Sequence, residues 1–314
     1  MMIAVAMCLG GLVALVLGGD WLVRGAVSLA VRLGVSGLFT GLVIVGIGTS
    51  MPELVTSIEA ALAGSPGIAW GNIAGSNIAN TLLILGIAAL IQPIALNRVD
   101  SMRDAITALA GSVMLFVVAW FAWGSIWIGL ALLAAIAGYI AWRYTHSRQP
   151  GEEPSLQEGA PVPANLSVPA AGALLLTGLG VMVFGASFLV SGAVDLARLF
   201  GMSETVIGLT IVAVGTSLPE LTASAIAAWR GHSDLAIGNV LGSNVFNILL
   251  IGGVTMIAAP GAIPAEMIDI ELPLVVASSL LLVWFIAYRK QIGRIAGAVL
   301  TALFVANTAF LLAA

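Results

Sequence analysis

Charged residues and cysteine are scarce in this chain of 314 residues. Lysine, arginine, aspartate and glutamate together make up 8% of it, whereas hydrophobic residues make up 60%. A water-soluble fold of this length has too little interior to bury so large an apolar fraction. The single cysteine, Cys8, excludes a disulfide framework. The formal net charge of −4 is too small and too dispersed for a nucleic-acid surface, so we expect no nucleic-acid partner.

Long apolar runs recur along the whole chain. Each is about 20 residues or longer, the length that crosses a ~30 Å hydrocarbon core. The sequence therefore predicts an all-α membrane protein in a lipid bilayer. Its ten transmembrane helices are expected near residues 3–31, 36–62, 67–91, 103–121, 125–144, 167–199, 204–229, 234–258, 270–289 and 293–312. Residues 145–166, rich in proline, glycine and glutamate, are expected to form a cytoplasmic linker.

An internal repeat relates the two halves of the chain. GLVIVGIGTSMPELVTSIEAALAG, from residue 41, matches GLTIVAVGTSLPELTASAIAAWRG, from residue 208. GNIAGSNIANTLLILG, from residue 71, matches GNVLGSNVFNILLIGG, from residue 238, at the same separation of 167 residues (208 − 41 and 238 − 71). We expect a five-helix repeat in residues 1–144 and another in 167–314. Because five is odd, the second repeat enters the membrane from the opposite side, and the repeats are inverted.

The basic residues indicate an orientation. If the N-terminus is external, Arg198 alone falls outside and the other ten basic residues lie at or near cytoplasmic ends. These ten are Arg24, Arg32, Arg98, Arg103, Arg143, Arg148, Arg230, Arg289, Lys290 and Arg294. Basic residues favour cytoplasmic loops, so this distribution predicts that both termini are extracytoplasmic.

Glu53 and Glu220 are equivalent acids inside otherwise apolar spans. A charge there costs about 2.5–3.5 kcal/mol on insertion scales, so its presence points to a function. Inverted repeats bring equivalent positions together near the middle of the membrane, where the two carboxylates would repel one another. A bound divalent cation removes that repulsion.

The residues before each acid suit a hard cation. Pro52 and Pro219 predict helix breaks at Gly48-Thr49-Ser50 and Gly215-Thr216-Ser217, where carbonyl oxygens point into the bundle. Thr49 and Thr216 each lie four residues before the acid, which predicts a hydroxyl and a carboxylate on one helical face. Oxygen ligands of these kinds are typical of sites for hard cations.

Polar residues also recur at intervals of four on the next span of each half. The stripes are Asn72, Ser76 and Asn80, and Asn239, Ser243 and Asn247. Such stripes can also serve as interhelical hydrogen bonds, and for Asn72 and Asn239 both interpretations stay open. Ser76, Asn80, Ser243 and Asn247 are favoured as ligands because the acid-bearing spans adjoin them.

The motifs GTSMPEL and GTSLPEL, followed by GSNIAN and GSNVFN, resemble the two alpha-repeats of the cation/Ca2+ exchanger superfamily, specifically the prokaryotic sodium/calcium exchangers. The resemblance implies that Glu53, Glu220 and the carbonyls of Thr49 and Thr216 hold Ca2+. It implies Na+ binding by Ser50, Ser76, Ser217 and Ser243, with the Ala213 carbonyl. Some relatives carry aspartate where this chain has Asn247, so we hypothesise exchange that does not depend on K+.

The resemblance implies a Na+/Ca2+ antiporter of the plasma (inner) membrane that works by alternating access. The sliding of spans one and six against the bundle also comes from the resemblance. Ca2+ and Na+ are the transported ions, no cofactor is expected, and the chain is expected to act as a monomer or weak oligomer. The alternatives are an H+/Ca2+ antiporter and a cation channel. A hydrolase is disfavoured, because no span supplies a base for Ser50 or Ser217.

Two further acids lack an acidic counterpart in the other half. Asp20 corresponds to Ser187, and we expect it to pair with Arg24 one turn away. Glu59 corresponds to Ile226 and is expected to extend toward the membrane surface rather than bind an ion.

Overall fold

The computed structural model describes residues 1–96, 98–147, 166–202, 213–261 and 263–313. In the first half the elements are α1 (Met2–Leu33), α2 (Gly37–Phe39), the π-helix η1 (Thr40–Val45), α3 (Gly46–Thr49), α4 (Met51–Leu62), α5 (Pro66–Ala79), the π-helix η2 (Asn80–Ile84), α6 (Leu85–Ile91), β1 (Ile94–Ala95), α7 (Arg98–Trp120) and α8 (Ile126–Ser147). In the second half they are α9 (Val168–Leu199), α11 (Ala213–Thr216), α12 (Leu218–Trp229), α13 (Ser233–Phe246), the π-helix η4 (Asn247–Ile251), α14 (Gly252–Ala258), the 3-10 helix η5 (Ala265–Ile268), α15 (Glu271–Tyr288), β2 (Gln291–Ile292) and α16 (Arg294–Ala313).

Among the described residues, eight helices are long and apolar enough to cross a membrane. A ninth candidate is the bent pair Gly37–Thr49 and Met51–Leu62, whose axes differ by 42°. The expected helical class is confirmed, and most helix ends lie close to their predicted positions. α7 begins at Arg98, ahead of the apolar run, and α8 continues to Ser147, into the segment expected as linker. The expected span 204–229 begins outside the described residues, which show its later part from Ala213.

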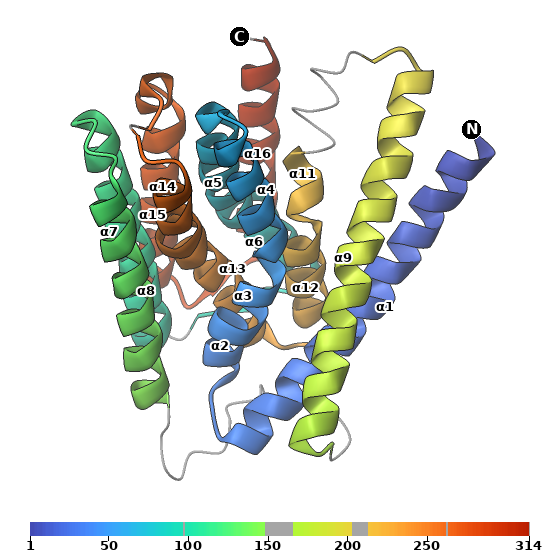
Figure 1. Ribbon diagram of the computed structural model, residues 1–314. Coiled ribbons are helices and arrows are strands. Elements are labelled where there is room, and N and C mark those ends of the chain that lie inside the picture. The colour runs from blue at the N-terminus through green and yellow to red at the C-terminus, as the bar shows by residue number, and fades with distance from the viewer. Residues whose placement is uncertain (97, 148–165, 203–212, 262, 314) are drawn as a thin grey trace.

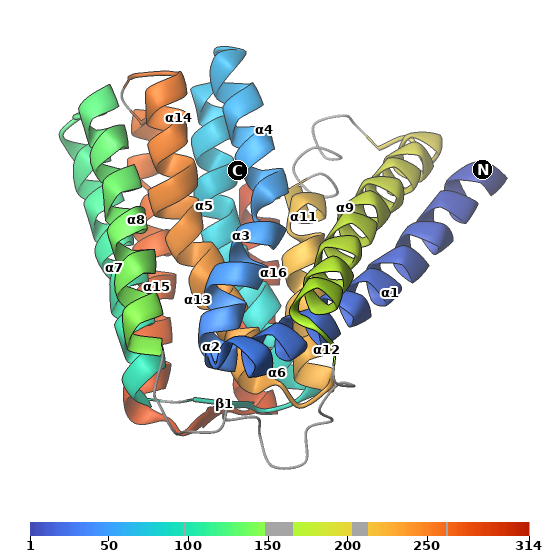
Figure 2. The ribbon, with the colours of Figure 1, turned by 60° about the horizontal axis from the view of Figure 1, so that its bottom comes forward.

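One short strand pair was not indicated by the sequence. β1 and β2 pair antiparallel, with Ile94 opposite Ile292, and both isoleucines are buried. Pro93 stops α6 from continuing and leaves the following residues extended, so their backbone groups find partners across the pair. The pair ties the chain after α6 to the chain before α16, at one end of the bundle (Figure 2).

The helices are arranged around a central group. In Figure 1, α1 and α9 lie together on one side, and α7 and α8 lie on the other. The central spans Pro66–Ile91 and Ser233–Ala258 are 78% and 83% buried in their most apolar windows, against 28% for α1. The start of α1 and the end of α16 lie at the same end of the bundle (Figure 1).

α1 and α9 pack against each other along their length through small residues. Gly11 faces Gly185, and Gly18 faces Gly178, so the two helices run antiparallel. A Cβ atom on Gly18 would lie 2.7 Å from the carbonyl oxygen of Gly178 and 2.8 Å from the backbone nitrogen of Met182. The two backbones are therefore too close for any larger residue at this position.

We expect Gly18→Ala to lower the thermal stability of the purified protein, because its methyl group forces two helix backbones apart. Overpacking of this kind typically costs about 1–3 kcal/mol. Gly10→Ala is the matched control on the same helix, since a Cβ at Gly10 meets no described atom within 4 Å. Unfolding of both variants is followed in detergent by the loss of the monodisperse peak after heating. Equal stability of the two variants would contradict the close approach of α1 and α9.

Candidate functional site

The candidate site is built on two helix breaks. Ser50 (φ −82°, ψ 4°) separates α3 from α4, and Ser217 (φ −88°, ψ 7°) separates α11 from α12. Pro52 lies near the start of α4, where its missing N–H is not needed. The breaks predicted from the prolines are confirmed, and each places its acid, Glu53 or Glu220, in the first turn of the following helix.

The two acids lie in one buried cluster that both halves of the chain supply. Glu53 is 1% exposed and Glu220 is 2% exposed. The Ser217 hydroxyl donates a hydrogen bond to Glu53 Oε1 at 3.2 Å. The side chains of Ser50 and Thr49 lie beside the Glu220 carboxyl, which also interacts electrostatically with Glu53. Each acid therefore faces the helix break of the other half.

Several buried polar atoms of the cluster have no hydrogen-bond partner among the described residues. They are Ser50 Oγ, Glu53 Oε2, Glu220 Oε2, Asn80 Oδ1 and Nδ2, Ser243 Oγ and Asn247 Oδ1. An unpartnered buried polar group costs about 1–3 kcal/mol, and native structures contain few of them. All but one of these atoms are oxygens, so the arrangement suits a hard cation.

Asn80 and Asn247 each open a π-helix, η2 and η4. Turns of this kind are rare and are frequent at functional sites. η2 packs against α12, and η4 packs against α4, so each turn adjoins the acid-bearing helix of the other half. Ser76 and Ser243 are buried one turn earlier, on α5 and α13. These four residues lie on elements that pack against the acid-bearing helices α4 and α12.

The two threonines of the motifs end α3 and α11. The single proton of the Thr49 hydroxyl is shared between two acceptors, Val45 O at 3.1 Å and Asn239 Oδ1 at 3.2 Å. The Thr49 side chain also lies beside the Glu220 carboxyl of the other half. Thr216 ends α11 and is half-buried.

Asn72 and Asn239 form interhelical hydrogen bonds at equivalent places. Asn72 Nδ2 donates to the Glu53 carbonyl oxygen at 3.1 Å and to Ser57 Oγ at 2.9 Å. Asn239 Nδ2 donates to the Glu220 carbonyl oxygen at 3.3 Å and to Ser224 Oγ at 2.9 Å. The sequence left both asparagines open between binding and packing. Serine at equivalent positions 57 and 224 was the signal available for these contacts.

The two other acids singled out from the sequence, Asp20 and Glu59, lie outside this cluster. Asp20 contacts Arg24 at 3.7 Å, as expected, and it also pairs with Arg230 from the end of α12, which the sequence did not indicate. Glu59 is exposed on α4. Both acids therefore have surroundings unlike those of the buried pair.

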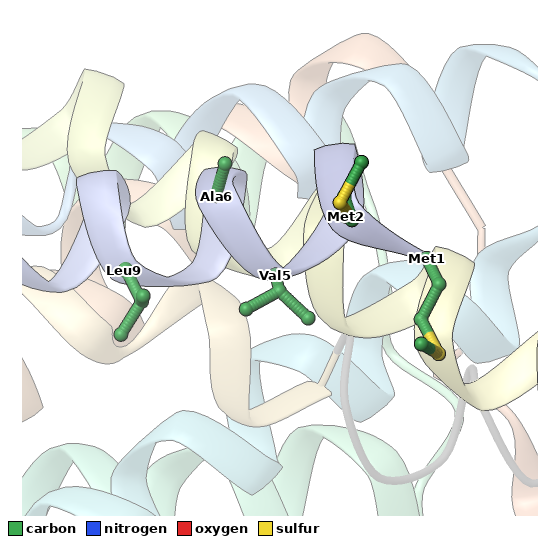
Figure 3. A pocket seen from close by; sticks show the side chains of 5 residues that line it. All are labelled: Met1, Met2, Val5, Ala6 and Leu9. Carbon is green, nitrogen blue, oxygen red and sulfur yellow. The ribbon is translucent and has the colours of Figure 1, made fainter.

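Neither the surface hollow at the start of α1 nor a cluster of metal-ligating side chains offers a second ion site in the described part of the chain. An open hollow at the start of α1 is lined by Met1, Met2, Val5, Ala6 and Leu9 (Figure 3), and these apolar side chains offer no ligand for an ion. In the described ranges, no group of three or more His, Cys, Asp or Glu side chains could hold a metal. A cation in the buried cluster would therefore bind to two carboxylates and neutral oxygens.

Comparisons with known proteins match both halves of the chain. The family model described as "Sodium/calcium exchanger protein" matches residues 3–145 and 170–313. The chain is 37% identical to the putative antiporter CaxA of Alkalimonas amylolytica, over 97% of each chain. It is 34% identical to the sodium/calcium exchanger MaX1 of Methanosarcina acetivorans, over 94% of this chain and 95% of MaX1.

Solved structures of a sodium-calcium exchanger share the fold of this chain. A structure of the sodium-calcium exchanger NCX_Mj, soaked with 10 mM Na+ and 10 mM Sr2+, superposes with a TM-score of 0.85 at 34% identity, covering 98% of both chains. That structure belongs to work on extracellular ion exchange and induced occlusion of the binding site in NCX_Mj. The chain therefore belongs to the sodium/calcium exchanger family of integral membrane transporters.

Proposed function

We propose that this protein is a Na+/Ca2+ antiporter that moves Ca2+ across a plasma (inner) membrane in exchange for Na+. One observation carries the proposal: the two equivalent, buried carboxylates of Glu53 and Glu220 each retain an oxygen without a partner among the described residues. A divalent cation between them neutralises both charges and supplies the missing partners. The names of MaX1 and NCX_Mj support Na+ as the counter-ion.

The proposed ion site combines residues from both halves. Glu53, Glu220 and the carbonyl oxygens of Thr49 and Thr216 hold Ca2+. Na+ is held by the serines at the breaks and on the next helices, with two asparagines close by. These are Ser50, Ser217, Ser76, Ser243, Asn80 and Asn247. The hydrogen bond from Ser217 to Glu53 and the proximity of Ser50 to Glu220 support shared use of the site by both halves.

The proposed architecture is ten transmembrane helices in two inverted five-helix repeats, residues 1–144 and 167–314, joined by a linker at 145–166. The antiparallel course of α1 and α9 supports the inversion. So does the hydroxyl–hydroxyl contact of 2.9 Å between Ser112 and Ser279, which are 167 residues apart. Contact between equivalent residues is the property of a two-fold axis. The common end of α1 and α16 supports two termini on the same side of the membrane, and the distribution of basic residues favours the extracytoplasmic side (Figure 1).

The proposed mechanism is alternating access with one shared site. Ca2+ and Na+ compete for the same two carboxylates, so release of one ion permits binding of the other. α1 and α9 form the pair that moves against the remaining helices. Their dense contact with each other and their low burial in the bundle support movement as one unit.

Purified protein in liposomes loaded with Na+ is expected to take up radiolabelled Ca2+ when diluted into a medium free of Na+ and K+. Uptake should need internal Na+, because the counter-ion must leave through the same site. A pH gradient without internal Na+ should drive no uptake, and adding K+ should change the rate little.

The other outcomes separate the alternatives. Uptake driven only by the pH gradient would indicate an H+/Ca2+ antiporter. Flux without any counter-ion, at rates far above those of carriers, would indicate a channel. Transport only in the presence of K+ would reject the K+-independent mechanism. No Ca2+ flux under any gradient would reject Ca2+ as the substrate.

A further inference from the structure

Asn239 on α13 connects two parts of the candidate site that come from different halves of the chain. Its Nδ2 donates to the Glu220 carbonyl oxygen at 3.3 Å and to Ser224 Oγ at 2.9 Å, both on α12. Its Oδ1 accepts a hydrogen bond from the Thr49 hydroxyl at 3.2 Å, on α3. The asparagine is 1% exposed, so water does not compete for these contacts.

The chemistry of the partners determines the orientation of the amide. A backbone carbonyl oxygen only accepts, so the NH2 group of Asn239 must face Glu220. Its oxygen is then left to face Thr49, whose hydroxyl proton it shares with Val45 O. A leucine of similar size could make neither contact.

Thr49 and Glu220, which Asn239 connects, lie where regular helix geometry is interrupted. Thr49 is the last residue of α3, before the break at Ser50. Glu220 lies in the first turn of α12, directly after the break at Ser217. Because helix hydrogen bonding is incomplete at such ends, side-chain contacts determine where their backbones lie. The Glu220 carboxylate and the Thr49 carbonyl move with those backbones.

We propose that Asn239 is a positioning residue of the ion site, which fixes the separation of Thr49 in the first half from Glu220 in the second. The inference rests on the proposed function. Both polar groups of Asn239 already have protein partners, unlike Asn247, whose Oδ1 has none among the described residues. Asn239 therefore acts through Thr49 and Glu220 and does not bind the cation itself.

Loss of the Asn239 contacts is expected to lower the affinity for Ca2+ more than the maximal rate of transport. A ligand cage for a divalent cation depends on the spacing of its oxygens, and small displacements weaken binding. Loss of the Asn239 contacts frees the Thr49 and Glu220 backbones without removing a ligand. Ca2+ should still be transported at saturating concentration, but half-saturation should need more of it.

The test compares Asn239→Leu with Asn244→Leu in equilibrium Ca2+ binding and in Na+-driven Ca2+ uptake. Asn244 is a matched control because it is also 1% exposed on α13, and its Nδ2 donates to Thr81 Oγ1 at 3.0 Å rather than to the acid-bearing helix. We expect Asn239→Leu to raise the dissociation constant and the half-saturating Ca2+ concentration by at least tenfold, with a change of less than threefold in maximal rate. Asn244→Leu should leave the dissociation constant and the half-saturating Ca2+ concentration within twofold of the values for the unsubstituted protein.

A double-variant comparison separates positioning from general damage. Thr49→Val removes the hydroxyl but keeps the backbone carbonyl, so its effect on Ca2+ affinity should not add to that of Asn239→Leu. If Asn239→Leu does not fold, Asn239→Ser replaces it with the same readouts. Affinity within twofold of the original in the Asn239 variant, or fully additive effects, would overturn the inference while leaving the antiporter proposal intact. Absence of Ca2+ binding and transport in the original protein would instead reject the proposed function, and this inference with it.

Discussion

Glu220→Gln is expected to abolish Ca2+ exchange, with at least a 100-fold loss of Na+-driven uptake, while the protein stays folded. Glutamine keeps the shape of the side chain but removes one of the two charges that balance a divalent cation. Because Glu220 is 2% exposed, water cannot replace that charge. Removal of the charge also ends its repulsion with Glu53, so the folded state should not lose stability. Initial uptake rates and thermal unfolding are measured on the same preparations.

Glu59→Gln is the matched control for this experiment. Glu59 lies on α4 with Glu53 but is exposed, and its counterpart in the second half is Ile226. Its neutralisation should leave uptake within twofold of the original rate. Glu53→Gln should reproduce the loss seen at Glu220, because the two acids occupy equivalent positions. Substantial exchange in either buried-acid variant would mean that the ions cross elsewhere.

The spans and the paired acids could be predicted from the sequence because both leave a pattern along the chain. Lipid requires runs of apolar residues, and duplication keeps equivalent positions at a constant offset. The breaks before Glu53 and Glu220 could also be predicted, since a proline removes a backbone donor wherever it occurs. The spans, the paired acids and the breaks can therefore be recognised from residue type, run length and sequence offset, without knowledge of how the helices pack.

Other features depend on how helices are rotated against each other, which no local pattern encodes. The π-turns that begin at Asn80 and Asn247 change the direction of the following side chains, yet their sequences read as ordinary apolar helix. The pairing of Asp20 with Arg230 joins residues 210 positions apart. Arg143 was expected at a cytoplasmic helix end, but the structure buries it at 1% exposure against α7.

That buried arginine leads to the second large expected effect, on stability. Arg143 Nε lies 3.0 Å from Asp104 Oδ1, and Arg143 Nη2 donates to Asp104 Oδ2 at 3.2 Å. Tyr139 donates a hydrogen bond to the same carboxylate at 2.6 Å. Asp104→Leu would leave the arginine charge buried with only the more distant Asp100 carboxylate, at 3.5 Å. Breaking a buried pair from one side typically costs about 3–5 kcal/mol.

The double variant Asp104→Leu with Arg143→Met should recover most of this loss, because it removes both charges together and fills the space with apolar atoms. Replacement of a buried pair by apolar residues is often neutral or stabilising. Arg103→Met is the control for an exposed pair: Arg103 lies 3.7 Å from Asp100, and such pairs contribute at most about 1 kcal/mol. Thermal unfolding in detergent ranks the variants. If the double variant is no more stable than Asp104→Leu alone, the loss arises from packing around Asp104 and not from the uncompensated charge of Arg143.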